Sequence, residues 1–133
     1  MAGTFKFELV SPERIVVSAD VTEVQLPGAD GDMTVYAGHA PVVSTLLPGS
    51  VRAVMSGGIK RVFVNGGLAE ISPNAVTILA ERAYVTDEAD PRQIESDLAE
   101  AEAALKAADS DDARHHIGRA IDELKALVEQ RRG

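Results

Sequence analysis

VRAVMSGGIKRVFVNGGLAEISPNAVTIL, residues 51–79, is the stretch that decides the fold class. Apolar side chains alternate here with polar ones, as they do in strands that bury one face. Turn-forming pairs interrupt the alternation at Gly57-Gly58, Gly66-Gly67 and Pro73-Asn74, which are only seven to nine residues apart. Because a parallel sheet needs about a dozen residues of crossover between strands, this stretch predicts an antiparallel β-sandwich or flattened barrel.

The same pattern extends upstream to the N-terminus. Residues 5–9 alternate apolar and polar side chains, which is the two-residue period of a strand. Another strand ends at Pro27-Gly28, and the apolar run at residues 33–36 follows a turn-rich segment. We therefore expect residues 1–86 to form one β-sandwich domain.

The composition of the chain changes sharply after residue 86. Residues 1–86 hold all five aromatic residues, nine of the eleven glycines and five of the six prolines, with eight acidic and six basic side chains. Residues 87–133 hold no aromatic residue, ten alanines, and thirteen acidic against seven basic side chains. Since Ala, Glu, Leu and Arg favour helix, residues 87–133 are predicted to be helical, and they carry most of the net charge of −8.

Residues 87–133 are predicted to form an antiparallel hairpin of two helices. Asp90-Pro91 supplies an N-cap and a proline at the first helical position, and residues 109–112 interrupt the pattern and offer a second N-cap. Apolar residues form one stripe on each helix: Ile94, Leu98, Ala101, Leu105 and Ala108, then Ile117, Ala120, Ile121, Leu124, Leu127 and Val128. Because both stripes are narrow and rich in alanine, the hairpin is expected to be only marginally stable by itself. The predicted fold class is therefore α+β by content, a sandwich followed by a helical hairpin.

Composition and charge exclude several classes of function. With 21 acidic against 13 basic side chains, the chain lacks the clustered positive charge that nucleic acids and anionic lipid surfaces require. It contains no cysteine, which excludes disulfides, thiolate metal sites and thiol catalysis. No apolar run approaches the ~20 residues of a membrane-spanning helix, and the first ten residues resemble neither a signal nor a transit peptide. We expect an intracellular protein that does not insert into a membrane.

Two histidine–aspartate pairs near the start of the second helix invite a metal interpretation. Asp111 with His115, and Asp112 with His116, are each four residues apart and would share a helix face. A divalent metal needs three or four convergent ligands, whereas the faces of His115 and His116 diverge by about 100° around the helix. A solvated helix N-terminus is therefore favoured over a metal site.

His39 and the acidic segment 28–32 are the candidate sites in the sandwich. A lone histidine in the loop at residues 36–41 could serve as the base of a cysteine-free enzyme or small-molecule binder. No serine or acid stands near it in sequence to complete a catalytic relay, so a structural or interface role is favoured. Residues 28–32 lack the ligand spacing of a calcium loop and predict an exposed acidic tip that offers a docking point. No phosphate-binding or nucleophile motif occurs, and no catalytic or metal-binding residue is assigned.

The run PGADGDMTVYAGHAP, residues 27–41, resembles the epsilon subunit of bacterial F-type ATP synthases. That family typically has a G-x-x-G-[DE]-x-x-[IV]-x-x-x-H-A-P pattern at this place. Residues 47–49, 63–71 and 76–81 are similar to later segments of the same family. The resemblance covers nearly all of residues 1–86, whereas the helical tail is similar in length and position more than in sequence.

The resemblance implies a sandwich of about ten strands plus a helical hairpin, with no active site, cofactor or metal of its own. It implies a non-catalytic rotor subunit in the central stalk of the proton-translocating ATP synthase, peripheral at the cytoplasmic face of the bacterial inner membrane. Such a subunit couples rotation of the c ring, through the gamma subunit, to ATP synthesis. The resemblance also implies two sets of contact residues on this chain. Asp30, Gly31 and Asp32 would contact the c ring, and Ser11, His39 and Ser44 would contact gamma.

The tail of some members of this family has two further functions. It binds ATP through an [IL]-D-x-x-R-A motif, where this chain has ADPRQI at residues 89–94. Asp90 is kept, but Gln93 replaces the motif's arginine and cannot make its bidentate, charge-assisted contact, so nucleotide binding would need Arg92 instead. The tail also extends to inhibit ATP hydrolysis by the alpha and beta subunits of the catalytic head. Five basic residues of the second helix would meet an acidic loop there: Arg114, Arg119, Lys125, Arg131 and Arg132.

Overall fold

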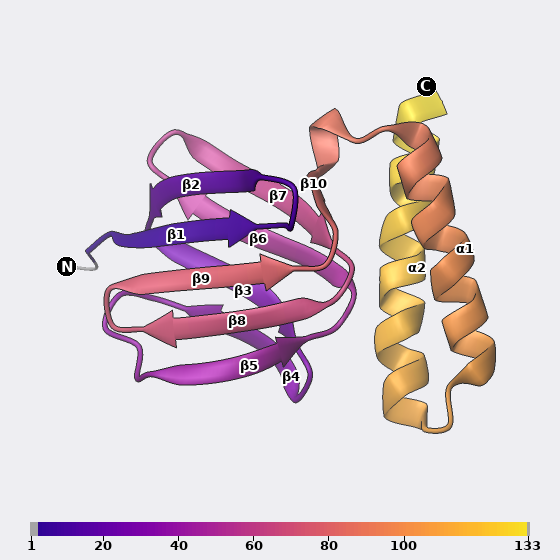
Figure 1. Ribbon diagram of the computed structural model, residues 1–133, viewed down its shortest axis with the longest axis horizontal. Coiled ribbons are helices and arrows are strands. Elements are labelled where there is room, and N and C mark those ends of the chain that lie inside the picture. The colour runs from indigo at the N-terminus through magenta and orange to yellow at the C-terminus, as the bar shows by residue number, and fades with distance from the viewer. Residues whose placement is uncertain (1–2, 133) are drawn as a thin grey trace. The chain divides into compact units, whose positions relative to one another are not determined.

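The computed structural model describes the backbone of residues 3–132 and the side chains of residues 3–130. The basic side chains expected at residues 131 and 132 therefore lie outside the described part of the chain. The chain divides into two compact units, Met1–Val85 and Thr86–Gly133. The first is a β-sandwich and the second a pair of helices (Figure 1), so the predicted fold class is confirmed.

The sandwich contains ten strands in two layers. Their bounds are β1 Phe5–Val10, β2 Ile15–Val21, β3 Glu23–Gly28, β4 Gly31–Val35, β5 Val42–Leu46, β6 Gly49–Met55, β7 Gly58–Val64, β8 Gly67–Ser72, β9 Ala75–Ala80 and β10 Ala83–Val85. Strands β5-β8-β9-β1-β2 form one layer, here called the front layer, which faces the viewer in Figure 1. Strands β4-β3-β6-β7-β10 form the back layer. The layers are joined where Gly28 of β3 pairs with Leu46 of β5.

One strand pair departs from the antiparallel arrangement that the sequence predicts. Strand β1 runs parallel to β9, with Phe7 opposite Val76 and Leu9 opposite Ile78. The other pairs are antiparallel, including β6–β7 and β8–β9, which the glycine and proline turns of residues 51–79 predict. Because β1 is the first strand and β9 is nearly the last, this parallel pair ties the N-terminal end of the unit to its C-terminal end.

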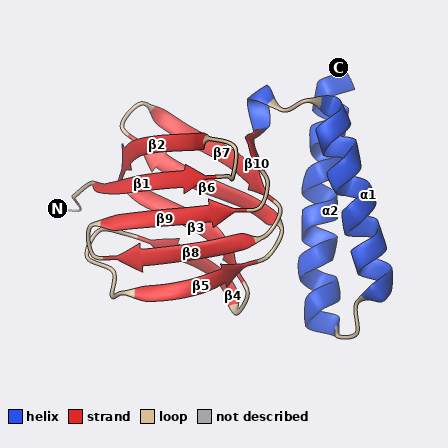
Figure 2. Cartoon of the chain, viewed as in Figure 1, coloured by secondary structure: helices blue, strands red, loops and turns tan. Residues whose placement is uncertain are grey.

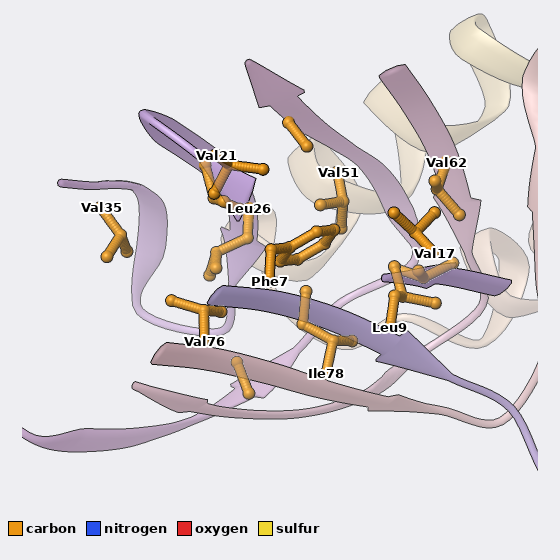
Figure 3. Close-up of a cluster of buried hydrophobic side chains, with 14 of the residues drawn as sticks. Phe7, Leu9, Val17, Val21, Leu26, Val35, Val51, Val62, Val76 and Ile78 are labelled. Carbon is orange, nitrogen blue, oxygen red and sulfur yellow. The ribbon is translucent and has the colours of Figure 1, made fainter. Parts of the chain in front are cut away.

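Alternate residues of each strand point between the layers and form the core (Figure 3). Phe7, Leu9 and Ile78 are completely buried, together with valines from both layers such as Val21 of β2 and Val62 of β7. Burying a side chain of this size contributes about 1.5–3 kcal/mol relative to leaving it exposed. The alternation predicted for residues 5–9 therefore places Phe5, Phe7 and Leu9 in the core and leaves the intervening residues on the outer face of the front layer.

The second unit begins with a short 3-10 helix, Thr86–Glu88, and continues with α1, Pro91–Ala107, and α2, Asp111–Arg132 (Figure 2). Both predicted caps are present. The Asp90 carboxylate accepts from the Arg92 N–H at 2.9 Å, and the Ser110 Oγ accepts from the Ala113 N–H at 3.1 Å. Each cap satisfies a backbone donor that has no partner within its helix.

The predicted apolar stripes lie on the protected sides of the two helices, with one addition. Ile94, Ala120, Ile121, Leu124 and Leu127 are buried, while Leu98 and Leu105 are half-buried. Asp97, which lies three residues after Ile94 on the same face of α1, is also buried, with 2% of its surface exposed. The sequence gives no indication that this carboxylate is buried, because it resembles the many exposed acids of the hairpin.

Candidate interaction surfaces

The outer face of the front layer carries a row of apolar side chains. Pairing places Leu68 opposite Leu79, Leu79 beside Val10, and Val10 opposite Ile15, so four adjacent strands contribute to one row. Ile15 is 59% exposed and Leu79 47%, and Val10 and Leu68 are half-buried. We call these four residues the apolar row. A contiguous apolar stripe on an exposed sheet face is typical of a surface that contacts another protein.

A shallow groove of about 520 Å³ lies on the same layer at its β5 edge. Val42 and Val43 of β5 line it on one side, and Glu70, Ser72 and Thr77 contribute polar atoms from β8 and β9. Val43 is 63% exposed, which is a high fraction for a valine in a strand. The groove therefore extends the exposed apolar surface of the front layer to its edge.

The acidic tip is a tight hairpin between β3 and β4. Gly28 pairs with Gly31, so that Ala29 and Asp30 alone form the turn. The Ala29 N–H donates to the Thr45 carbonyl at 2.8 Å and thereby fixes the turn against β5. Asp30 and Asp32 are exposed and Gly31 is half-buried. The arrangement is the exposed acidic tip that the sequence predicts; contact of the tip with a c ring stays a prediction.

His39 lies in a loop held by its own backbone. The Gly38 N–H donates to the Pro73 carbonyl at 2.7 Å, and the His39 N–H donates to the Tyr36 carbonyl at 3.3 Å. The His39 Nδ1 lies 2.7 Å from the Ala40 carbonyl oxygen, which can only accept, so this nitrogen carries the proton. Within the described residues no carboxylate or hydroxyl bonds to the ring. A structural or interface role for His39 stays a prediction.

The structure does not bring Ser11, His39 and Ser44 together. Ser11 lies in the turn after β1, where its Oγ donates to the Arg14 carbonyl at 3.4 Å. His39 lies near Pro73, at the opposite end of the sandwich, because β1 begins beside the turn that contains Pro73. Ser44 lies in the middle of β5, opposite Ala69. The three residues therefore border the front layer at separate places rather than forming one site.

The outer face of the back layer carries a cluster centred on Glu23. Its carboxylate accepts from Arg52 Nη1 at 3.3 Å and from Gln25 Nε2 at 3.4 Å. The same carboxylate lies beside the Tyr36 hydroxyl, and its negative charge, followed by their hydrogen bond, raises the pKa of Tyr36 above the ordinary value of 10.0. Sequence reasoning missed this cluster, because Glu23, Tyr36 and Arg52 come from three strands or their ends and meet only through the sheet register.

The two candidate nucleotide-binding residues of the hairpin contact each other. Arg92 Nη2 lies 3.3 Å from the Asp90 Oδ2, while the other oxygen of this carboxylate caps α1. The Arg92 side chain is 91% exposed, so the pair is a solvated ion pair at a helix terminus and contributes at most about 1 kcal/mol. That nucleotide binding is disfavoured at this place, because Gln93 replaces the motif's arginine, stays a prediction.

The histidine–aspartate pairs of α2 differ from each other. His116 Nε2 lies 3.5 Å from Asp112 Oδ1, whereas Asp111 is bound by Arg114 at 2.6 Å rather than by His115. The rings of His115 and His116 meet edge to face, with centroids 5.6 Å apart. Among the described residues no three potential metal ligands converge. Nor does either described helix have the length and apolar character to cross a membrane.

A ten-stranded sandwich with an exposed apolar row, followed by a helical hairpin, is the architecture expected of a subunit that contacts another protein. The comparisons with known proteins agree with this class. The family profile described as "ATP synthase, Delta/Epsilon chain, beta-sandwich domain" matches residues 4–86. The ATP synthase epsilon chain of Fuscovulum blasticum is 48% identical over 128 residues, which cover 96% of this chain and 95% of that protein. The ATP synthase epsilon chain of Rhizobium meliloti (strain 1021) is 45% identical over 130 residues, 97% of this chain and 96% of that one.

The chain belongs to the ATP synthase delta/epsilon chain family. The resemblance seen at residues 27–41 is thereby confirmed. A chain in the OSCP/F1/c-ring structure of the Euglena gracilis mitochondrial ATP synthase has the same fold, with a TM-score of 0.66, 23% identity, and coverage of 96% of this chain and 81% of that one. A chain of the Tetrahymena thermophila mitochondrial ATP synthase central stalk and c ring aligns with a TM-score of 0.58 and 11% identity over 97% of each chain.

Proposed function

We propose that this chain is a non-catalytic rotor subunit of a proton-translocating F-type ATP synthase. In this function it joins the central stalk and couples rotation of the c ring, through the gamma subunit, to ATP synthesis. Its membership of the family and the central-stalk assembly from which one similar structure comes support the proposal. On this chain itself, the apolar row is the main support for the proposed function, because an exposed apolar stripe across four strands is typical of a surface that binds another protein.

Gamma is the partner that we assign to the front layer. The apolar row and the groove beside β5 together offer Ile15, Leu79 and Val43 as exposed apolar contacts. These side chains project from hydrogen-bonded strands whose opposite faces are packed in the core, so they are held in place before binding. Such preorganisation lowers the entropy cost of association, and a stiff sheet transmits torque better than a loop surface does.

The acidic tip is the surface that we assign to the c ring. Asp30 and Asp32 are exposed at the end of a two-residue turn, where they can accept hydrogen bonds from polar loops. The Ala29–Thr45 backbone hydrogen bond ties the turn to β5 of the front layer. A force applied at the tip is thereby passed directly to the layer that we assign to gamma.

The helical hairpin is the regulatory part of the proposal. It carries most of the negative charge but also Arg114, Arg119 and Lys125 on α2, which could meet acidic surface on the alpha and beta subunits. By this proposal the hairpin restrains ATP hydrolysis when it reaches the catalytic head. The complex would lie at the cytoplasmic face of a bacterial inner membrane, with this subunit peripheral.

A capture experiment tests the assignment of gamma to the front layer. Affinity-tagged chain expressed in its own host should co-purify with gamma and the c ring, and Leu79→Asp should reduce capture of gamma about tenfold or more by placing a charge in an apolar interface. Ser56→Asp adds the same charge at an exposed turn position and should leave capture unchanged. Wild-type chain that captures neither gamma nor the catalytic head would refute the function. Equal capture by Leu79→Asp and wild type would refute only the assigned surface.

A further inference from the structure

The outer face of the back layer has two adjacent rows of side chains that the proposed function does not use. Register places Glu23 opposite Val54 and Val54 opposite Ile59, with Tyr36 at the end of β4 beside Glu23. The next row contains Thr34, Gln25, Arg52 and Arg61, one residue from each of four strands. We call the part formed by Tyr36, Val54, Ile59, Arg52 and Arg61 the basic–apolar face.

The two arginines of this face lie directly opposite each other. Arg52 of β6 pairs with Arg61 of β7, and like charges at opposite positions of an exposed sheet face destabilise the pair. Arg52 is compensated by Glu23, at 3.3 Å. Arg61 is exposed and, within the described residues, forms no ion pair. The fold therefore carries an uncompensated guanidinium next to a like charge, an arrangement that an external carboxylate would relieve.

Few acidic side chains surround Arg61, although the chain as a whole is acidic. Glu23 is the only acidic residue in the two rows. Asp32 lies one row further along the same face, beyond Thr34, and Glu8, Asp20 and Glu70 belong to strands of the front layer. Tyr36 is 52% exposed and Ile59 is 49% exposed, so apolar surface borders the positive charge on the same face. Tyr and Arg are the residue types most enriched where protein interfaces bind most strongly.

We propose that the basic–apolar face binds an acidic segment of a second polypeptide within the same complex. A carboxylate of that segment pairs with Arg61, and its apolar side chains contact Ile59 and Tyr36. The inference rests on the proposed function for one point only, which is that the partner is sought within the ATP synthase complex. A phosphate backbone is a poorer match, because a single uncompensated arginine offers too little positive charge for one. Anionic lipid is likewise a poorer match for this face.

Photo-crosslinking in the assembled complex tests the proposal. A benzoylphenylalanine residue placed at position 59 in the full chain, within the complex purified from membranes, should crosslink to one segment on ultraviolet irradiation. Peptide sequencing should show that this segment contains at least two acidic residues close to the crosslinked residue. Crosslinking to a segment without acidic residues, or no crosslink although gamma is still captured, would overturn the proposal. A chain that does not co-purify with the complex at all would instead refute the proposed function.

Charge reversal provides the second readout. Arg61→Glu should lower the crosslink yield about tenfold or more, since it places two like charges together in the interface. Lys60→Glu makes the same change in net charge one residue away, at a position that pairs with buried Ala53 instead of facing outward, and should leave the yield unchanged. Both variants are first compared with wild type by urea unfolding, so that a loss of fold is recognised as such.

A charge swap and a vesicle experiment complete the test. Replacing the acidic residue nearest the crosslink in the partner by lysine should restore the yield with Arg61→Glu, and failure to restore it would contradict direct pairing. Flotation with vesicles of phosphatidylglycerol and cardiolipin should show no binding that depends on Arg61. Binding to these vesicles that Arg61→Glu abolishes would overturn the proposal in favour of a lipid surface.

Discussion

Gly28 and Gly31 face each other at the base of the two-residue turn that joins β3 to β4. A Cβ atom on Gly28 would lie 2.7 Å from the Gly31 carbonyl oxygen and 3.2 Å from the Ser44 Oγ. Gly31 itself has a φ of 129°, a conformation that side chains with a Cβ rarely adopt. The acidic tip therefore depends on glycine at two positions, for space at the first and for backbone conformation at the second.

Replacing Gly28 by alanine should therefore destabilise the sandwich. The added methyl group meets backbone, which cannot rotate away, so we expect a loss of about 1–3 kcal/mol in the free energy of unfolding. Gly57→Ala is the matched control, because its Cβ would meet no atom within 4 Å and its φ is not positive. That change should stay within about 0.5 kcal/mol. Urea unfolding of both variants measures the difference, and equal midpoints would show that the turn can relax.

The Tyr36–Glu23 contact should be visible in a pH titration. The Glu23 carboxylate disfavours the negatively charged phenolate, so Tyr36 should ionise above its ordinary pKa of 10.0. Ultraviolet absorbance follows the ionisation, and Tyr36→Phe assigns the signal to Tyr36. Glu23→Gln should move the pKa of Tyr36 back towards 10.0. Because the pKa is raised in the folded state, the contact's stabilisation is present below pH 10 and is lost as the pH rises through the folded-state pKa. Identical titrations of the wild type and Glu23→Gln would contradict the assigned cause.

Local patterns in the sequence predict the sandwich well, but they do not predict which strands that are distant in the sequence pair with each other. Residues 51–79 become β6 to β9 because their alternation and their turns act between neighbours in the chain. Strand β5 has two consecutive exposed valines, Val42 and Val43, so its alternation is hidden. The parallel pairing of Phe7 with Val76 joins strands from the two ends of the unit, and no local pattern indicates it.

The interaction surfaces are less predictable than the fold, because they depend on register. Ile78 and Leu79 are consecutive apolar residues, which indicates a strand with apolar side chains on both faces. The sequence does not show that Leu79 meets Val10 and Ile15 in one row, since that follows from the pairing of three strands. The acidic tip was predictable, because a two-residue turn between glycines is a local feature.

The N-cap of α1 should account for measurable helix stability. Asp90→Ala removes the acceptor of the Arg92 N–H and should cost about 1 kcal/mol, seen as lower helicity and an earlier thermal transition in circular dichroism. Asp90→Asn keeps the acceptor but not the charge, and should cost much less, because the ion pair with Arg92 is solvated. Equal losses in the two variants would mean that the charge matters more than the cap.

The hairpin of this chain should not bind ATP tightly. Arg92 is paired with Asp90, which also caps α1, and Gln93 offers no positive charge. Calorimetric titration of the full chain with ATP and magnesium should therefore show no saturable heat at micromolar nucleotide. Gln93→Arg restores the guanidinium of the family motif, so this variant should show saturable ATP binding where the wild type does not. Micromolar binding by the wild type would show that Arg92 is recruited despite its pairing.

The two units should differ in their ability to fold alone. A fragment of residues 1–86 keeps all ten strands and the completely buried core around Phe7, so it should unfold cooperatively in urea with a midpoint close to that of the whole chain. A fragment of residues 87–133 has six buried apolar side chains among its described residues, two of them alanine, and helices of this length are marginal without tertiary packing. Its circular dichroism should show partial helix and a broad thermal transition. A sharp, concentration-independent melt of the 87–133 fragment would contradict the expectation. It would mean that the seam between α1 and α2 stabilises the hairpin more than its alanine-rich stripes indicate.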